Sequence, residues 1–184
     1  MAAVGGTVLG TVGAAVVAHI FAGSAHLMGM HTQEAQQLYF TADIAIDFRG
    51  LLLAGFILGA LGAIMDVCVS IASSVQEISK ADPDMSFLQL FRSGLNVGKD
   101  VLGTMANTLI LAYTGSALPL LLLLGVHPID TIKLMNLDVI ATEVVRALSG
   151  SIGMVLSVPA TALLAAFLVA RETPLKSDTP ADGE

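Results

Sequence analysis

Asp66 is the residue of this sequence whose type and position most strongly suggest chemistry. It lies in the otherwise apolar run LLLAGFILGALGAIMDVCVSIASSVQEIS (residues 51–79). In a helix it would be about three residues, or about 4.5 Å, from the middle of residues 51–75. A carboxylate at mid-membrane depth is costly, so such residues usually face a bundle interior or an ion path. We expect Asp66 to be a buried protonatable group, with a structural acid that joins helices as the alternative.

Small and polar residues share one helical face with Asp66 and recur along it at steps of three and four. Glycines at such spacing let another helix approach closely. We therefore expect the N-terminal half of this face to pack against a helix and the C-terminal half to be polar. The face consists of Gly55, Gly59, Gly62, Asp66, Ser70, Ser73 and Glu77.

A second polar face predicts a partner for Asp66. Thr104, Asn107 and Thr108 lie within one turn of each other in an apolar stretch at residues 101–125. The Asn107 amide can accept a hydrogen bond from a protonated Asp66 or donate one to an ionised Asp66. We expect Thr104 and Thr108 to line the same proton or ion pathway, together with Ser70 and Ser73. A simple contact between helices is the alternative for Asn107.

A third face, in the last apolar segment, combines two charges with two glycines. Glu143 and Arg146 are one helical turn apart, which predicts an ion pair at the membrane edge. Gly150 and Gly153 follow on the same side, and we expect them to serve helix packing.

Catalytic and metal-binding motifs are absent from the sequence. It contains neither a Gly-x-Ser-x-Gly motif nor a Gly-rich phosphate loop, so we expect no enzyme and no cofactor. His19, His26 and His31 are spaced by seven and five residues, whereas helical zinc ligands favour steps of three or four, so we expect no metal site. Cys68 is the single cysteine, which excludes a disulfide within the chain.

Composition places these residues in a polytopic membrane protein of the all-α class. The 184 residues are 55 % hydrophobic and 12 % charged, against about 25 % charged in soluble domains. The net charge of −7 argues against nucleic-acid binding. We expect a transmembrane domain over residues 1–171 and a disordered acidic tail over residues 172–184. The predicted spans are residues 2–22, 50–74, 101–125 and 147–170.

The segments between the apolar stretches predict a helix at the membrane surface and the orientation of the chain across the membrane. Met85, Leu88, Phe91 and Leu95 recur at helical spacing, which indicates a short interfacial helix within residues 79–98. A cytoplasmic N-terminus would place five of the eight Lys and Arg residues inside, as the positive-inside rule favours.

Three long motifs resemble the YibE/F family of bacterial multi-spanning membrane proteins. They are GALGAIMDVCVSIASSVQEI (residues 59–78), LFRSGLNVGKDVLGTMANTLILAYTGSALPLLL (residues 90–122) and RALSGSIGMVLSVPATALLAA (residues 146–166). The resemblance implies the bacterial cytoplasmic (inner) membrane, and an F-type subunit or C-terminal portion whose E-type partner supplies further parts. A homo-oligomer is the other assembly that we expect.

A weaker similarity connects the chain with the membrane core of SecF, which belongs to the RND superfamily. In those proteins an acid in the corresponding span takes part in proton passage, and the matching position here is Asp66. The similarity implies a bundle like half of an RND/SecDF core, acting in ion- or proton-coupled transport. The alternatives are a non-transporting scaffold subunit, in which Asp66 is structural, and one half of a passive channel.

Overall fold

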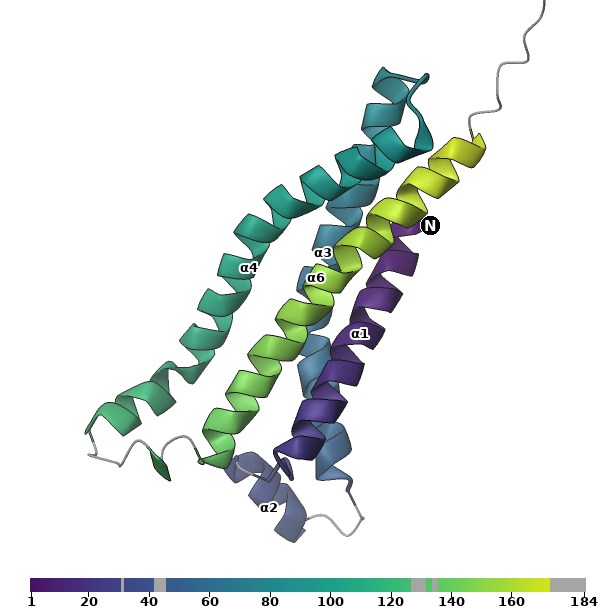
Figure 1. Cartoon of the computed structure of the whole chain (residues 1–184). Coiled ribbons are helices and arrows are strands. Elements are labelled where there is room, and N and C mark those ends of the chain that lie inside the picture. Colours follow the sequence, from purple (N-terminus) through teal and green to yellow (C-terminus); the bar gives the residue numbers. More distant parts are fainter. Residues whose placement is uncertain (31, 42–45, 127–131, 134–135, 173–184) are drawn as a thin grey trace, which may run out of the picture.

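The computed structural model describes residues 1–30, 32–41, 46–126, 132–133 and 136–172, and this part of the chain contains helices and no strands. Helix labels follow Figure 1. The elements are α1 (Ala2–Ser24), α2 (Gln33–Thr41), α3 (Phe48–Ala81), α4 (Phe87–Val126) and α6 (Asp138–Glu172).

Four of these helices, α1, α3, α4 and α6, are long and apolar enough to cross a membrane. They form an antiparallel bundle in which the N-terminus and the end of α6 lie at the same end (Figure 1). Helix α6 packs against all three others, most extensively against α1, whereas α1 and α4 lie on different sides of it. The short helix α2 lies at the opposite end of the bundle from the N-terminus.

The contact between α1 and α6 is made by small residues. Every fourth residue of α1 is buried, and all of them are Ala or Gly. A methyl group built on Gly10 would lie 2.6 Å from the Cβ of Ser157 and 3.0 Å from the carbonyl oxygen of Gly153. The two backbones therefore approach closely enough for van der Waals packing to hold them together without large side chains. The α1 residues of this stripe are Ala2, Gly6, Gly10, Ala14, Ala18 and Ala22.

Helix α3 buries a face of larger apolar residues. Ile64, Val67 and Ile71 are all fully buried in the main core cluster, which also contains residues of α1, α4 and α6. On α4, Gly94 and Gly98 bring the backbone against this face, and a methyl group on Gly94 would lie 2.8 Å from Val75. The N-terminal third of α4 is thus part of the bundle.

The observed helices extend the predicted spans and correct one prediction. A separate interfacial helix within residues 79–98 is not confirmed, because residues 87–98 form the first turns of α4 and Leu90 is only 3 % exposed. Of the four apolar residues at that spacing, Met85, Phe91 and Leu95 pack against the core, whereas Leu88 is 53 % exposed. Helix α2 was not predicted. The tail predicted from residue 172 lies outside the described residues, apart from the end of α6.

Substitution of glycine by alanine tests this packing. We expect Gly153→Ala to lower the free energy of unfolding by about 1–3 kcal/mol, the usual cost of overpacking. The added methyl group would lie 2.6 Å from the Cβ of Ala14 and 2.9 Å from the carbonyl oxygen of Gly10. Denaturant unfolding of the detergent-solubilised chain measures the change.

The matched control is Gly62→Ala on α3, because a methyl group at Gly62 meets no atom within 4 Å. The control should not lower the free energy of unfolding, and we expect it to raise this free energy by up to about 1 kcal/mol, because alanine favours a helix over glycine. An equal loss in both variants would contradict the tight contact between α1 and α6.

Candidate functional site

Asp66 lies close to the middle of α3, on the side opposite the core. Its neighbours Val67 and Cys68 are fully buried, whereas the Asp66 side chain is exposed. Within the described residues no hydrogen bond or ion pair reaches its carboxylate. The described helices therefore do not bury Asp66, and its role as a buried protonatable group stays a prediction.

The physical reason is a competition between the two faces of α3. The face with Ile64, Val67 and Ile71 offers large apolar surface to α1, α4 and α6. Turning Asp66 inward instead would place a carboxylate in that core without a partner, which is strongly unfavourable. The apolar face is therefore buried, and the polar face points away from the bundle.

The polar residues of α4 lie at the depth of Asp66. Gly98 contacts Ile71, and the Tyr113 hydroxyl lies 3.9 Å from a methyl group built on Gly59. The stretch of α4 between Gly98 and Tyr113 therefore runs beside the stretch of α3 that contains Asp66.

The α4 polar side chains nevertheless do not contact Asp66. Thr104, Asn107 and Thr108 are exposed. The Thr104 hydroxyl donates to the Val101 carbonyl at 2.9 Å, and the Thr108 hydroxyl donates to the Thr104 carbonyl at 3.2 Å. The predicted hydrogen bond between Asp66 and Asn107 is not among the contacts of the described residues, because both side chains point out of the bundle.

The serines near Asp66 lie toward the end of the bundle where the chain begins. Ser70 is half-buried and Ser73 is exposed. Ser73 lines a cavity of about 380 Å³ together with Met1, Gln76 and Ala165. The structure thus places a recess beside Ser73, about two helical turns beyond Asp66 on α3.

The predicted packing glycines fall into two groups. A methyl group on Gly150 would lie 2.9 Å from the Tyr113 hydroxyl and 3.3 Å from the Cβ of Ala60, and Gly153 meets α1. Gly55 and Gly62 have no atom within 4 Å of such a methyl group. Among the described residues, the predicted close contact is therefore not made at Gly55 and Gly62, whereas Gly59 lies beside Tyr113.

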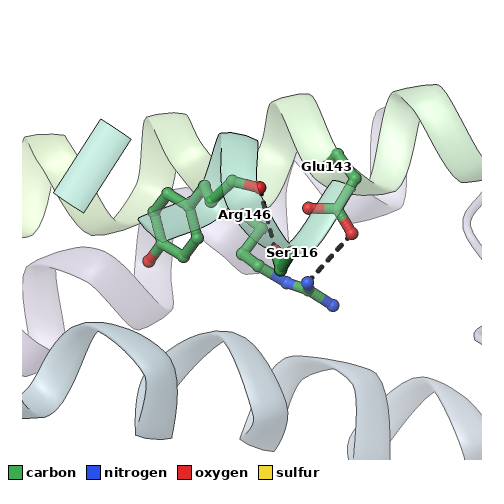
Figure 2. A network of polar contacts seen from close by, with 4 residues as sticks. Ser116, Glu143 and Arg146 are labelled. Atoms are coloured by element: carbon green, nitrogen blue, oxygen red, sulfur yellow. Dashed lines mark hydrogen bonds and ion pairs between the residues drawn. The ribbon is translucent and has the colours of Figure 1, made fainter. Parts of the chain in front are cut away.

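The second polar cluster lies between α4 and α6 and involves Glu143 and Arg146 (Figure 2). Arg146 Nη1 donates to Glu143 Oε1 at 2.9 Å, and the guanidinium carbon lies 5.5 Å from the centre of the Phe56 ring. Both charged side chains are about three-quarters buried, at 25 % and 28 % exposed. Ser116, also shown in Figure 2, donates its hydroxyl to the Tyr113 carbonyl at 2.8 Å.

Two buried oxygens beside this ion pair have no hydrogen-bond partner among the described residues, namely Glu143 Oε2 and the Tyr113 hydroxyl. Tyr113 and Glu143 line one cavity of about 290 Å³, and Arg146 lines another of about 280 Å³. Tyr113 is not among the predicted site residues, because a tyrosine in an apolar helix is usually an ordinary packing or interfacial residue.

The depth of the ion pair follows from the α1 contact. Gly153 packs against Ala14, near the middle of α1. Arg146 precedes Gly153 by seven residues, or about 10 Å along α6, in a hydrocarbon core about 30 Å thick. The pair therefore lies about 10 Å from the level of Ala14, toward the end of the bundle where α2 lies, and its position at the membrane edge stays a prediction.

These features define a multi-pass helical membrane protein with one open polar face and one internal ion pair. The family model of YibE/F-like proteins matches residues 1–171, so the chain belongs to the YibE/F family. No curated protein and no solved structure matches it.

A double-mutant cycle tests the internal ion pair. We expect Glu143→Gln and Arg146→Gln to show a coupling energy of about 1 kcal/mol or more, because each single change leaves a mostly buried partner uncompensated. Unfolding of the detergent-solubilised variants measures the coupling.

The control is the ion pair of Glu77 and Lys80 on α3. Its Oε1 and Nζ atoms are 2.7 Å apart, but the two side chains are 69 % and 61 % exposed. Its coupling energy should stay below about 0.5 kcal/mol, as for other exposed pairs on helices. Equal coupling in both pairs would show that the Glu143–Arg146 contact is not shielded from water.

Proposed function

We propose that this chain is a membrane-embedded subunit of a proton- or ion-coupled transport complex, and that Asp66 binds the proton where the chain meets another membrane protein. The observation that carries the proposal is the exposed, unpartnered carboxyl group near the middle of an apolar helix of 34 residues. Family membership and the apolar helices support a membrane role. The resemblance to half of an RND/SecDF core stays a prediction.

The energetics link the proton to assembly. An ionised carboxylate in contact with acyl chains is costly. Protonation removes most of that cost, and a covering protein that supplies donors or water also removes it. The charge state of Asp66 therefore biases the equilibrium between two arrangements of the covering helices, as a coupled transporter requires.

The surroundings of Asp66 fit an interface between chains. The open glycines Gly55 and Gly62 allow a second helix to approach α3 closely. Asn107 has an exposed amide at a similar depth on α4. The covering chain is an E-type partner or a second copy, and it completes a pathway along Asp66, Thr104, Thr108 and Ser73.

A non-transporting scaffold subunit is the second candidate function. The open glycine face favours it, because such a face serves assembly whether or not a proton moves. In that case Asp66 is a neutral hydrogen-bond donor to the partner chain. Asp66→Asn would then preserve both the complex and its cellular function, whereas Gly59→Leu would disrupt the complex.

Proton flux distinguishes these functions. The experiment uses the chain purified from native membranes, together with any protein that stays bound, reconstituted into liposomes that contain a pH-sensitive dye. We expect Asp66→Asn to reduce proton flux at least about tenfold, a loss typical of removing a required proton-transfer group. Asn keeps the size of the side chain but does not ionise.

Glu77→Gln is the matched control, because Glu77 lies on the same side of α3 at its exposed end. The control should retain the full flux, and both variants should co-purify with the same proteins as the unaltered chain. Equal flux through the Asp66→Asn preparation and the unaltered one, or no flux through either, would contradict transport that depends on Asp66.

A further inference from the structure

The turn that follows α1 brings one histidine and two methionines to a single cavity. His26, Met28 and Met30 line a space of about 440 Å³. The backbone is bent by left-handed residues at His26 (φ 52°) and Gly29 (φ 76°). A left-handed conformation is uncommon for residues other than glycine and often marks ligand-binding turns. This turn lies far along the sequence from Asp66 and belongs to neither polar cluster described above.

The His26 ring is oriented so that one of its nitrogens can bind a metal ion. Its Nδ1 atom lies 3.2 Å from the Ser24 carbonyl oxygen. Because a carbonyl oxygen only accepts, the hydrogen of this bond resides on Nδ1, and Nε2 of the neutral ring keeps its lone pair. An imidazole that donates through one nitrogen to a carbonyl and binds metal through the other is the usual arrangement in metal sites.

The methionines supply soft ligands that are accessible. Met28 is 64 % exposed and Met30 is 37 % exposed. Thioether sulfur selects Cu(I), and imidazole also binds copper. Zinc sites are instead built from imidazole, carboxylate and thiolate ligands.

We propose that His26, Met28 and Met30 form a binding site for a soft monovalent cation, Cu(I) or its analogue Ag(I). The site has one nitrogen and two sulfur ligands, which come from five consecutive residues. Asp47 and Arg49 line the same cavity with opposite charges. Affinity therefore comes from the soft ligands rather than from net charge. The assignment does not use His31, which lies outside the described residues.

The proposal is tested by Cu(I) binding to the detergent-solubilised full-length chain. Cu(I) is kept reduced with ascorbate, and its affinity is measured by competition with the chromophoric chelator bicinchoninate. We expect one Cu(I) per chain, displaced by Ag(I) and not by Zn(II). The double variant Met28→Leu/Met30→Leu should weaken binding by more than about 100-fold, because even second-shell changes at metal sites cost about 10- to 100-fold. Leucine nearly conserves the volume of methionine.

Two controls separate this site from other soft ligands in the chain. Met65→Leu on α3 removes a methionine that is 49 % exposed elsewhere and should leave Cu(I) affinity unchanged. The measurements are repeated in a Cys68→Ala background, because the buried thiol of Cys68 is the other strong ligand for Cu(I). X-ray absorption of the bound copper should show sulfur neighbours that are lost in the double methionine variant.

His26→Asn provides a second variant that respects the backbone, since asparagine tolerates the left-handed conformation. It should weaken Cu(I) binding at least about tenfold, while the control His19→Asn should not. Unchanged Cu(I) affinity in both the methionine and the His26 variants would overturn the proposal. Displacement of bound Cu(I) by Zn(II) would overturn it as well.

Discussion

The structure depends on one constraint, the absence of water in the core of a bilayer, which leaves polar groups to be satisfied by protein. Helix α3 meets this constraint with two different faces. Its large apolar residues close the core against α1, α4 and α6. Its opposite face carries an exposed carboxyl group, Asp66, near Gly62, where an added methyl group would meet no atom of the described residues within 4 Å. The bundle is thus well packed on one side of α3 and incomplete on the other.

Helix α6 makes that division possible. Its Gly153 and the α1 residue Gly10 allow the two helices to touch backbone to backbone, so α6 serves as the central helix of the bundle. Glu143 and Arg146 form an ion pair within α6, largely shielded beside Phe56, and Glu143 Oε2 has no hydrogen-bond partner among the described residues. The same fold therefore pairs one set of charges internally and presents Asp66 outward, and this contrast supports the proposal that another chain covers the Asp66 face.

The sequence predicted the class of fold and the four spans, because apolar length is a strong signal for membrane helices. It favoured the face of Gly55, Gly59 and Gly62 as the packed one, whereas the structure buries the face of Ile64, Val67 and Ile71. Both faces have equally regular helical spacing. Helical periodicity identifies faces but does not say whether a face meets the same chain or another one. Tyr113 was also not predicted from the sequence. Neither was the small-residue stripe around Gly10, because alanine and glycine do not stand out by their hydrophobicity in an apolar helix.

The central claim is that another protein covers the Asp66 face of α3 in the membrane. Site-specific photo-crosslinking in living cells tests it most directly, with a diazirine side chain at Leu58, which is 70 % exposed one turn from Gly62. The control position is Leu163 on the outer face of α6, which is 49 % exposed. We expect a protein adduct of defined mass at Leu58 and none at Leu163. Labelling of lipid alone at both positions would contradict the account.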